Sequence, residues 1–235
     1  MLGRYGKKSM IDRAARDKVI LAFEDYLDDQ ITAFEFDDRL QEIESTDRTV
    51  NEVIHAAWFH YDDCKDHKVH LSKPEWDYFQ RFLLILRSEA EMSSSESKRW
   101  SWDHALAWLA LIVFLGIAFV VEWGWHLLIW AIPFGIISIL ISIFRRRSVP
   151  DSSPGVIACM PFESLLQISW LRRQLPAFKK RRYRAEIGER KIRSQAEESF
   201  NSAFSYCFWI AFAPVVLLFQ GFPSSVDRTL KLTKP

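Results

Sequence analysis

Residues 105–121 read ALAWLALIVFLGIAFVV, and residues 127–144 read LLIWAIPFGIISILISIF. Each stretch is close to the roughly 20 residues that a helix needs to cross a hydrocarbon core of about 30 Å. They are separated by Glu122-Trp123-Gly124-Trp125-His126, a connection too short for anything but an antiparallel hairpin. The sequence therefore predicts a transmembrane helical hairpin over residues 102–144.

Tryptophan surrounds this hairpin, and tryptophan prefers the interface at both faces of a membrane. The tryptophans stand before the first apolar stretch and within the turn, at Trp100, Trp102, Trp123 and Trp125. We predict that these four side chains lie at the membrane interface. The alternative is a helix pair buried in a soluble core, but a chain of 235 residues has too little other material to enclose two such segments.

Basic residues flank the hairpin at its outer ends. Lys98 and Arg99 precede it, residues 145–147 are all arginine, and the turn contains neither lysine nor arginine. Because cytoplasmic loops are enriched in these residues, both outer ends are predicted to be cytoplasmic. The turn carries Glu122. An ionisable group at membrane depth is a candidate functional residue, although its position at the lip of the span favours a structural role.

We predict that residues 1–92, which precede the hairpin, form an acidic helical bundle. Apolar residues recur at helical spacing between charges over residues 9–29. Capping boxes, in which a Ser or Thr and a Glu three residues later satisfy the first amides of a helix, then occur at Thr32, Thr49 and Ser72. The predicted core consists of Trp58, Trp76, Phe79, Phe82 and Leu83. A polar, serine-rich linker is expected over residues 93–101.

The charge of the chain changes sign behind the bundle. Residues 1–98 hold 14 Lys and Arg against 21 Asp and Glu, a net charge of −7, whereas residues 99–235 hold 17 against 9, a net charge of +8. Residues 145–200 are predicted to form a basic cytoplasmic segment. In it, an apolar helix containing Trp170 precedes the run FKKRRYR at residues 178–184. This helix either lies in the membrane interface against anionic head groups or packs on the acidic bundle. The basic residues predicted to bind lipid or a partner are Arg172, Arg173, Lys179, Lys180, Arg181 and Arg182.

A third apolar stretch, AFSYCFWIAFAPVVLLFQGF, occupies residues 203–222. Its length favours a third transmembrane helix over a re-entrant segment, although Pro214 should kink it. A third span would place the tail, residues 223–235, outside the cell. The tail contains Arg228, Lys231 and Lys234, which conflicts with the expected distribution of positive charge.

Four of the six histidines gather between His55 and His70, together with several aspartates. Imidazole and carboxylate groups at this density could bind a divalent metal, and the candidate ligands are His60, Asp63, His67 and His70. The spacing matches no zinc signature, because HExxH and paired CxxC are both absent. The favoured interpretation is a solvated helix end and loop, and no cofactor is expected.

Other function classes receive little support from the sequence. The acidic front half does not favour nucleic-acid binding, and motifs for nucleotide binding, serine hydrolysis or kinase activity are absent. The pairs Asp28-Asp29 and Asp37-Asp38 are read as solvated surface rather than catalytic carboxylates. The three widely spaced cysteines and a charged N-terminus are consistent with an N-terminal domain in the reducing cytoplasm.

Three functional hypotheses follow. The first is a non-enzymatic integral protein of a bacterial-type cell membrane, whose cytoplasmic helical domain binds a protein partner. The second is an oligomeric, channel-like protein that perturbs the bilayer, with helix interfaces at Gly116, Ala118 and Gly135. The third is a membrane-tethered hydrolase that uses a metal at the histidine cluster. The lipid bilayer with its anionic head groups, a protein partner and a second copy of the chain are the expected contacts.

Overall fold

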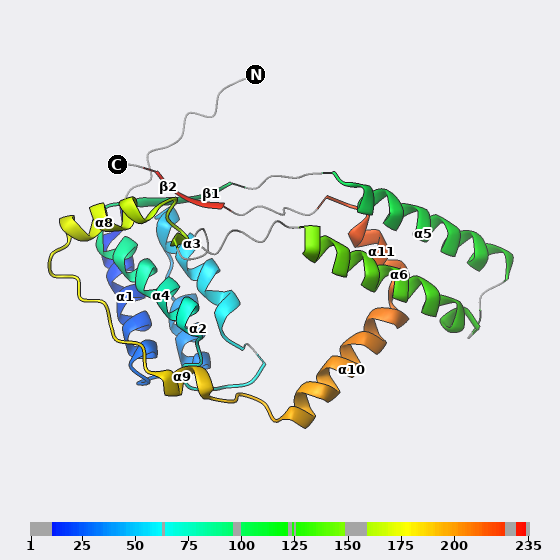
Figure 1. The fold of residues 1–235 in the computed structure, drawn as a ribbon, viewed down its shortest axis with the longest axis horizontal. Helices are drawn as coiled ribbons and strands as arrows, with labels where there is room; N and C mark the ends of the chain where they lie inside the picture. The colour runs from blue at the N-terminus through cyan, green and yellow to red at the C-terminus, as the bar shows by residue number, and fades with distance from the viewer. Residues whose placement is uncertain are drawn as a thin grey trace, which may run out of the picture. The chain divides into compact units, whose positions relative to one another are not determined.

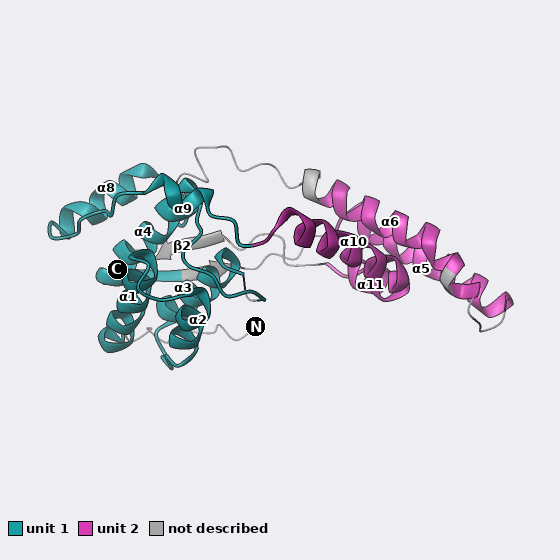
Figure 2. Cartoon of the chain, turned by 90° about the horizontal axis from the view of Figure 1, so that it is seen from below, with its two compact units in different colours: residues 1–95, 154–192, 229–235 teal, residues 96–153, 193–228 magenta. Residues whose placement is uncertain are grey.

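The computed structural model describes residues 11–62, 64–95, 100–121, 124, 126–148, 159–223 and 229–233, without side-chain detail at 93–95, 128, 146–148 and 229–233. The described chain is largely helical, and the predicted all-α fold class is confirmed. It divides into two compact units (Figure 2). Unit 1 contains Met1–Ser95, Pro154–Ile192 and Thr229–Pro235, and unit 2 contains Glu96–Ser153 and Arg193–Arg228.

The first helices of unit 1, which Figure 1 labels, begin at local capping residues. They are α1 (Arg13–Leu27), α2 (Ala33–Gln41), α3 (Arg48–Ala57), the short 3-10 helix η1 (Trp58–His60) and α4 (Lys73–Arg87). Capping boxes at Thr32 and Ser72 start α2 and α4 as predicted. The predicted start of α3 at Thr49 is wrong by two residues, because the carboxylate of Asp47 accepts the Thr49 amide and caps the helix instead.

An aromatic core holds these helices together. Phe23 of α1 lies with its ring centroid 5.2 Å from that of Phe36 and 5.1 Å from that of Phe79. Four of the five predicted core residues, Trp76, Phe79, Phe82 and Leu83, are buried in this cluster.

Trp58 is the exception among the predicted core residues, since 47% of its surface is exposed. The buried stripe of α3 follows Val50, Val53 and Ala57. A residue one position after Ala57 is rotated about 100° around the helix axis from that stripe. Trp58 therefore projects to the flank, where α3 gives way to η1.

The structure contains a small sheet that the sequence did not predict. Strand β1 (Glu91–Ser95) pairs antiparallel with β2 (Thr229–Thr233), so that Glu91 lies opposite Thr233 and Ser95 opposite Thr229. Met92 of β1 is buried, and its amide donates to the Thr49 hydroxyl at 2.9 Å. Part of the expected linker and part of the expected tail thus pair with each other in unit 1.

The segment after the hairpin also belongs to unit 1. It contains α8 (Leu165–Gln174) and α9 (Ala185–Glu189), joined by an extended stretch. Ile168 and Leu171 of α8 and Ile187 of α9 are buried in the same core cluster as α1 and α4. Apolar contacts therefore fold residues 159–192 onto the bundle, although they lie far from it in the sequence.

Unit 2 contains the predicted helical hairpin. Helices α5 (Trp102–Val120) and α6 (His126–Ser148) lie against each other, with the rings of Phe114 and Phe134 in edge-to-face contact. Residues such as Leu109, Phe119 and Ile129 are exposed, so the outer surface of the hairpin is apolar. By length and composition, α5 is the one described helix that could cross a membrane by itself; the apolar part of α6, Ile129–Arg145, is shorter.

The third apolar stretch is broken into two helices. Helix α10 (Gln195–Ala211) and helix α11 (Ala213–Gln220) are apolar and long enough for one span only when taken together, and they are bent by 82°. Pro214 lies in the first turn of α11, where its missing amide hydrogen costs little. Instead of a kink at this proline, the helix breaks sharply at Phe212. Helix α10 begins at Gln195, before the predicted apolar segment of residues 203–222.

Candidate functional site

Part of the predicted basic segment lies on the acidic face of unit 1. Lys180 contacts the carboxylate of Asp77 at 2.7 Å, and Arg181 contacts that of Asp28 at 3.0 Å. Arg190 binds Asp29 through two nitrogens, each 2.6 Å from a carboxylate oxygen. The acidic partners stand at the end of α1 and on α4.

Asp29 is the centre of this ionic contact. Its hydrogen bonds with Arg190 lower the pKa of the Asp29 carboxyl, although partial burial acts in the opposite direction. The backbone of Asp29 adopts a φ of 60°, in the left-handed region. Aspartate tolerates this conformation better than most residues, and the turn brings its carboxylate to Arg190 and Arg184.

Neutral hydrogen bonds hold the same segment in place. The indole of Trp76 donates to the Arg181 carbonyl at 3.3 Å, and the Arg181 amide donates to the Gln80 side chain at 3.0 Å. The hydroxyl of Tyr183 donates to the Leu71 carbonyl at 3.2 Å. In the structure, Lys180 and Arg181 lie on the acidic bundle, which is one of the two interpretations of this region.

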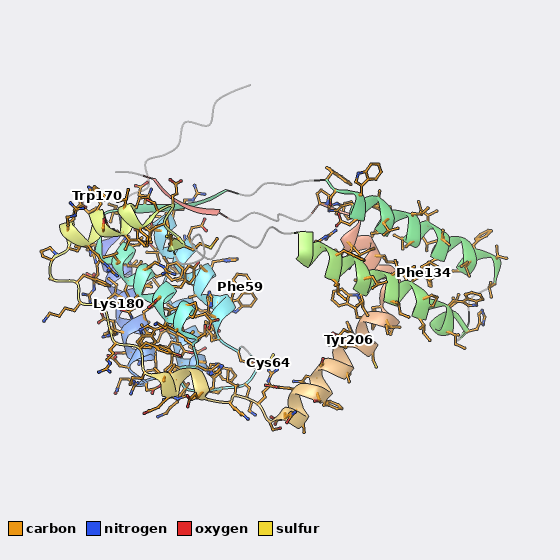
Figure 3. All side chains as sticks on the ribbon, in the orientation of Figure 1. Phe59, Cys64, Phe134, Trp170, Lys180 and Tyr206 are labelled. Carbon is orange, nitrogen blue, oxygen red and sulfur yellow. The ribbon has the colours of Figure 1, made fainter. Side chains whose placement is uncertain are left out.

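The other basic candidates face away from the bundle. Arg172, Arg173, Lys179 and Arg182 are exposed, and none forms an ion pair with another residue that the structure describes. They lie on the second half of α8 and on the stretch that follows it. Figure 3 shows Trp170 on α8 and Lys180 on this stretch.

Helix α8 is apolar on two faces. Ile168 and Leu171 are buried in unit 1, whereas Leu165, Leu166 and Trp170 remain exposed. Trp170 also lines a cavity of about 680 Å³, with both polar and apolar walls, between α8, the start of α1 and the end of α4. The predicted interface residue Trp170 thus lies at a surface that carries both apolar side chains and the exposed Arg172 and Arg173.

One end of unit 2 is closed by a polar contact. Asp103, at the start of α5, forms an ion pair with Arg145, near the end of α6, at 2.6 Å. Arg145 also donates to the carbonyl of Gln220 at the end of α11, at 3.1 Å. The indole of Trp108 donates to the neighbouring Gly221 carbonyl at 2.8 Å. The end of α11 therefore lies at the same level as the open end of the hairpin.

The break between α10 and α11 lies deeper in the unit. Trp209 donates to the hydroxyl of Ser138, midway along α6, at 2.7 Å. A Cβ added to Gly135 would lie 2.8 Å from the Cα of Ile210. Gly135 was expected at an interface between copies, but here it admits α10 of the same chain.

Polar atoms are buried in this apolar unit. The side-chain amide of Gln220 donates to the Ser138 carbonyl at 3.0 Å and to the Ser142 hydroxyl at 2.8 Å. The Gln220 side-chain oxygen and the Nε2 atom of His104 are buried and have no hydrogen-bond partner among the residues that the structure describes. Neither residue was identified from the sequence, because single polar residues in apolar stretches give no pattern.

The histidine cluster does not converge on one point. His60 donates to the Glu75 carboxylate at 3.4 Å, on α4. His67 uses both ring nitrogens on its own loop, accepting from the Asp62 amide at 3.1 Å and donating to the Lys68 carbonyl at 2.7 Å. Among the described residues, His, Cys, Asp and Glu form no group of three or more that could hold a metal ion. Asp63 lies outside them, and His70 is partly buried.

The remaining candidates concern the membrane interface. Trp100 and Trp102 are strongly exposed at the start of α5. Glu122, Trp123 and Trp125 lie outside the described residues.

An exposed aromatic pair was not predicted. Trp58 and Phe59 stand together in η1, with ring centroids 5.3 Å apart and with 64% of the Phe59 surface exposed. The only sign of this pair in the sequence is that Trp58 and Phe59 directly follow the apolar stripe of a helix, and the sequence predicts that Trp58 lies in the core.

The scan against family models matched no family, and the searches of curated proteins and solved structures found no similar protein.

Proposed function

We propose that this protein is a non-enzymatic membrane protein in which unit 2 is embedded in the bilayer and unit 1 binds a protein partner on the cytoplasmic side. The observation that carries the proposal is the outer surface of unit 2. Phe119, Val120 and Ile129 expose 90%, 79% and 70% of their surface. Contiguous apolar surface of this kind is rare on soluble monomers and is the ordinary surface of a helix in lipid.

The helix lengths support this placement. At 1.5 Å per residue, the 19 residues of α5 extend about 28 Å, which is close to the hydrocarbon thickness of about 30 Å. Helix α6 returns antiparallel to α5; it has 23 residues, of which the apolar part, Ile129–Arg145, is shorter than α5. The hairpin therefore crosses the membrane twice and leaves both its ends on one side.

The small sheet favours a re-entrant assignment for α10 and α11. Strand β1 precedes α5 and β2 follows α11, and the two strands pair within unit 1. Paired strands lie on the same side of a membrane, so the chain between them makes an even number of crossings. The hairpin supplies two, and the bent pair then enters and leaves from the same side. A cytoplasmic tail also agrees with the positions of Lys231 and Lys234.

The depth of the contacts agrees with this topology. Trp209 and Ile210, at the end of α10, contact the middle of α6. The carbonyl of Gln220, at the end of α11, accepts from Arg145 near the end of α6, while the Gln220 side chain reaches back to Ser138. The eight residues of α11 extend about 12 Å, less than half of a hydrocarbon core. Bent backbone at this depth is tolerated where it packs against other helices.

Cysteine accessibility in intact cells tests the embedding and the topology. Single cysteines would be placed at Gly124 and at Lys234 in a chain without Cys64, Cys159 and Cys207. An impermeant maleimide added outside should modify position 124, and position 234 only after the cells are opened. Modification of position 234 from outside would refute the re-entrant assignment, and release of the full chain by alkaline carbonate would refute the embedding.

The partner-binding role is proposed for the aromatic pair Trp58 and Phe59. Exposed aromatic side chains are enriched at the centres of protein interfaces. A photo-crosslinking residue at position 59 should attach to one defined protein in the native membrane, and Trp58→Ala should abolish the product. The matched control is the same residue at Leu21, which is similarly exposed on α1. Equal products at positions 21 and 59, or none at 59, would contradict the proposal.

A channel-like oligomer is the second candidate. The observation that favours it is the set of polar contacts that Gln220 makes with Ser138 and Ser142 within an apolar unit, because polar groups packed between membrane helices often line ion paths. Bilayer recordings of the purified chain would test it. Conductance that is lost in Gln220→Leu would favour this function over anchoring.

A further inference from the structure

The outward face of α8 is unusual for a helix on a folded domain. With 3.6 residues per turn, Leu166, Trp170 and Arg173 lie within about 60° of one another, on the side opposite Ile168 and Leu171. Ile168 and Leu171 face the core of unit 1, so the hydrophobic contact of α8 with the bundle is already made. Two large apolar side chains therefore stand on the face that an ordinary surface helix would fill with polar residues.

The charges beside this face are arranged in two sets. Lys180 and Arg181 turn inward to the carboxylates of α1 and α4. Arg172, Arg173, Lys179 and Arg182 are exposed, and no described carboxylate pairs with them. One set is thus paired with Asp77, Glu24 and Asp28, whereas the other set has no described carboxylate partner, and two of its members, Arg172 and Arg173, lie on α8 itself.

We infer that this α8 surface, formed by Leu166, Trp170 and Arg173 on the outward face and by Leu165 and Arg172 on the adjoining flank, lies in the head-group region of the membrane and binds anionic phospholipid. The apolar side chains enter the boundary between head groups and acyl chains, and the guanidinium groups bind lipid phosphates. Lys179 and Arg182 add to the attraction, which decays over a Debye length of about 8 Å at physiological salt. The inference rests on the proposed embedding of unit 2, because that anchor keeps unit 1 near the leaflet.

A lipid is favoured over a protein as the occupant because of the combination of groups. Two leucines and one tryptophan on a helix that also carries two arginines without a described carboxylate partner form the pattern of helices that lie in an anionic interface. Protein interfaces also favour tryptophan and arginine, but they are depleted in lysine and in charge at their buried centres. The aromatic pair on η1 is therefore assigned to the protein partner and α8 to the lipid.

Spin labels on the full chain in nanodiscs test this assignment. A single label at Leu166 would be compared with one at Leu21, in discs of neutral lipid alone and in discs that also contain phosphatidylglycerol. At position 166, anionic discs should raise collisions with oxygen and lower collisions with a water-soluble nickel chelate. At position 21, both collision rates should stay at their aqueous values in both lipids.

Charge removal supplies the matched control. Arg172→Gln with Arg173→Gln should return the label at 166 toward its aqueous state, with roughly a 5-fold loss in the bound-to-free ratio for each removed cation. Lys18→Gln with Lys73→Gln removes the same charge from exposed sites elsewhere on unit 1 and should leave the label unchanged.

Three outcomes would overturn the inference. The label at 166 could be aqueous in both lipids, the two double variants could behave alike, or protection could require added cytosolic protein and no anionic lipid. Resistance of the same chain to alkaline carbonate is measured in parallel. A chain that resists extraction while its α8 label remains aqueous refutes the lipid surface and leaves the proposed function intact.

Discussion

The buried ion pair between Arg16 and Asp47 allows the sharpest prediction for unit 1. Both side chains are completely shielded from solvent. Two guanidinium nitrogens of Arg16 lie 2.6 Å and 3.3 Å from the carboxylate oxygens of Asp47, and a third contact of 2.7 Å reaches the Ser88 carbonyl. Asp47 also accepts the amide of Thr49 at 2.9 Å, by which it caps α3. One ion pair thus connects α1, the start of α3 and the end of α4.

Replacement of Asp47 by alanine should remove about 3–5 kcal/mol from the unfolding free energy, because it leaves a charged guanidinium buried without its partner. Loss of the α3 cap should add about 1 kcal/mol. A domain of this size has a total stability of about 5–15 kcal/mol. Asp47→Ala should therefore leave unit 1 close to unfolding at 37 °C.

Replacement of Arg16 by methionine should cost less than Asp47→Ala. The remaining carboxylate keeps the Thr49 amide and can take up a proton, whereas arginine cannot lose its own in a protein. In the double variant Arg16→Met, Asp47→Ala, no buried charge remains. Its loss should be smaller than the sum of the two single losses, which is the sign of direct coupling.

Hydrogen exchange followed by mass spectrometry is the suitable assay, since peptides from α1 and α3 report on unit 1 separately from unit 2. The full chain would be studied in one detergent at one pH, with Arg48→Met as an exposed control on α3. A change of less than about 1 kcal/mol in Asp47→Ala would show that the pair does not stabilise the fold as reasoned.

Four further outcomes are expected. Trp76→Ala should destabilise unit 1 by about 3–5 kcal/mol, and an unchanged melting temperature would contradict its place in the core. Hydrogen bonding from His60 lowers the pKa of Glu75 to about 2. The ionised Glu75 therefore stabilises unit 1 above its unfolded pKa of about 4.3, and this stabilisation is lost as the pH falls toward 2. Glu75→Gln should make the stability of unit 1 depend less on pH between these two values. Gly135→Ala should loosen α10 from α6, because the added Cβ meets backbone, and unaltered exchange in α10 would argue against the contact. Protein purified without chelator should lack stoichiometric zinc or manganese; metal that is present and lost on His67→Ala would revive the hydrolase hypothesis.

Helix starts were predictable where the decisive contact is local. In the capping boxes at Thr32 and Ser72, the two partners stand three residues apart, so the sequence contains the whole interaction. The cap of α3 failed for the opposite reason. Asp47 is chosen over Thr49 as the cap because its carboxylate is held by Arg16 from another helix, and no local pattern reports a residue 31 positions away.

The basic segment shows the same limit for charge. Its basic composition predicted contact with negative charge, but the acidic bundle and the anionic head groups of the bilayer both provide negative charge. Which cations turn inward depends on where Asp77 and Asp28 stand after α1 and α4 have packed. The candidate surface on α8 could therefore be separated from the docked residues only after the fold was known.

The sequence by itself determined the helical hairpin and the helical class of the front domain, because helix length, apolar composition and capping act between near neighbours in the chain. Tertiary structure alone decided the pairing of β1 with β2, the bend of α10 against α11 and the division of the basic residues into two sets. Each of these depends on contacts between segments far apart in the sequence, such as Ser95 with Thr229 and Ser138 with Trp209. These contacts stabilise the protein only once packing has brought the two segments together. The sequence of either segment does not indicate which other segment it will contact.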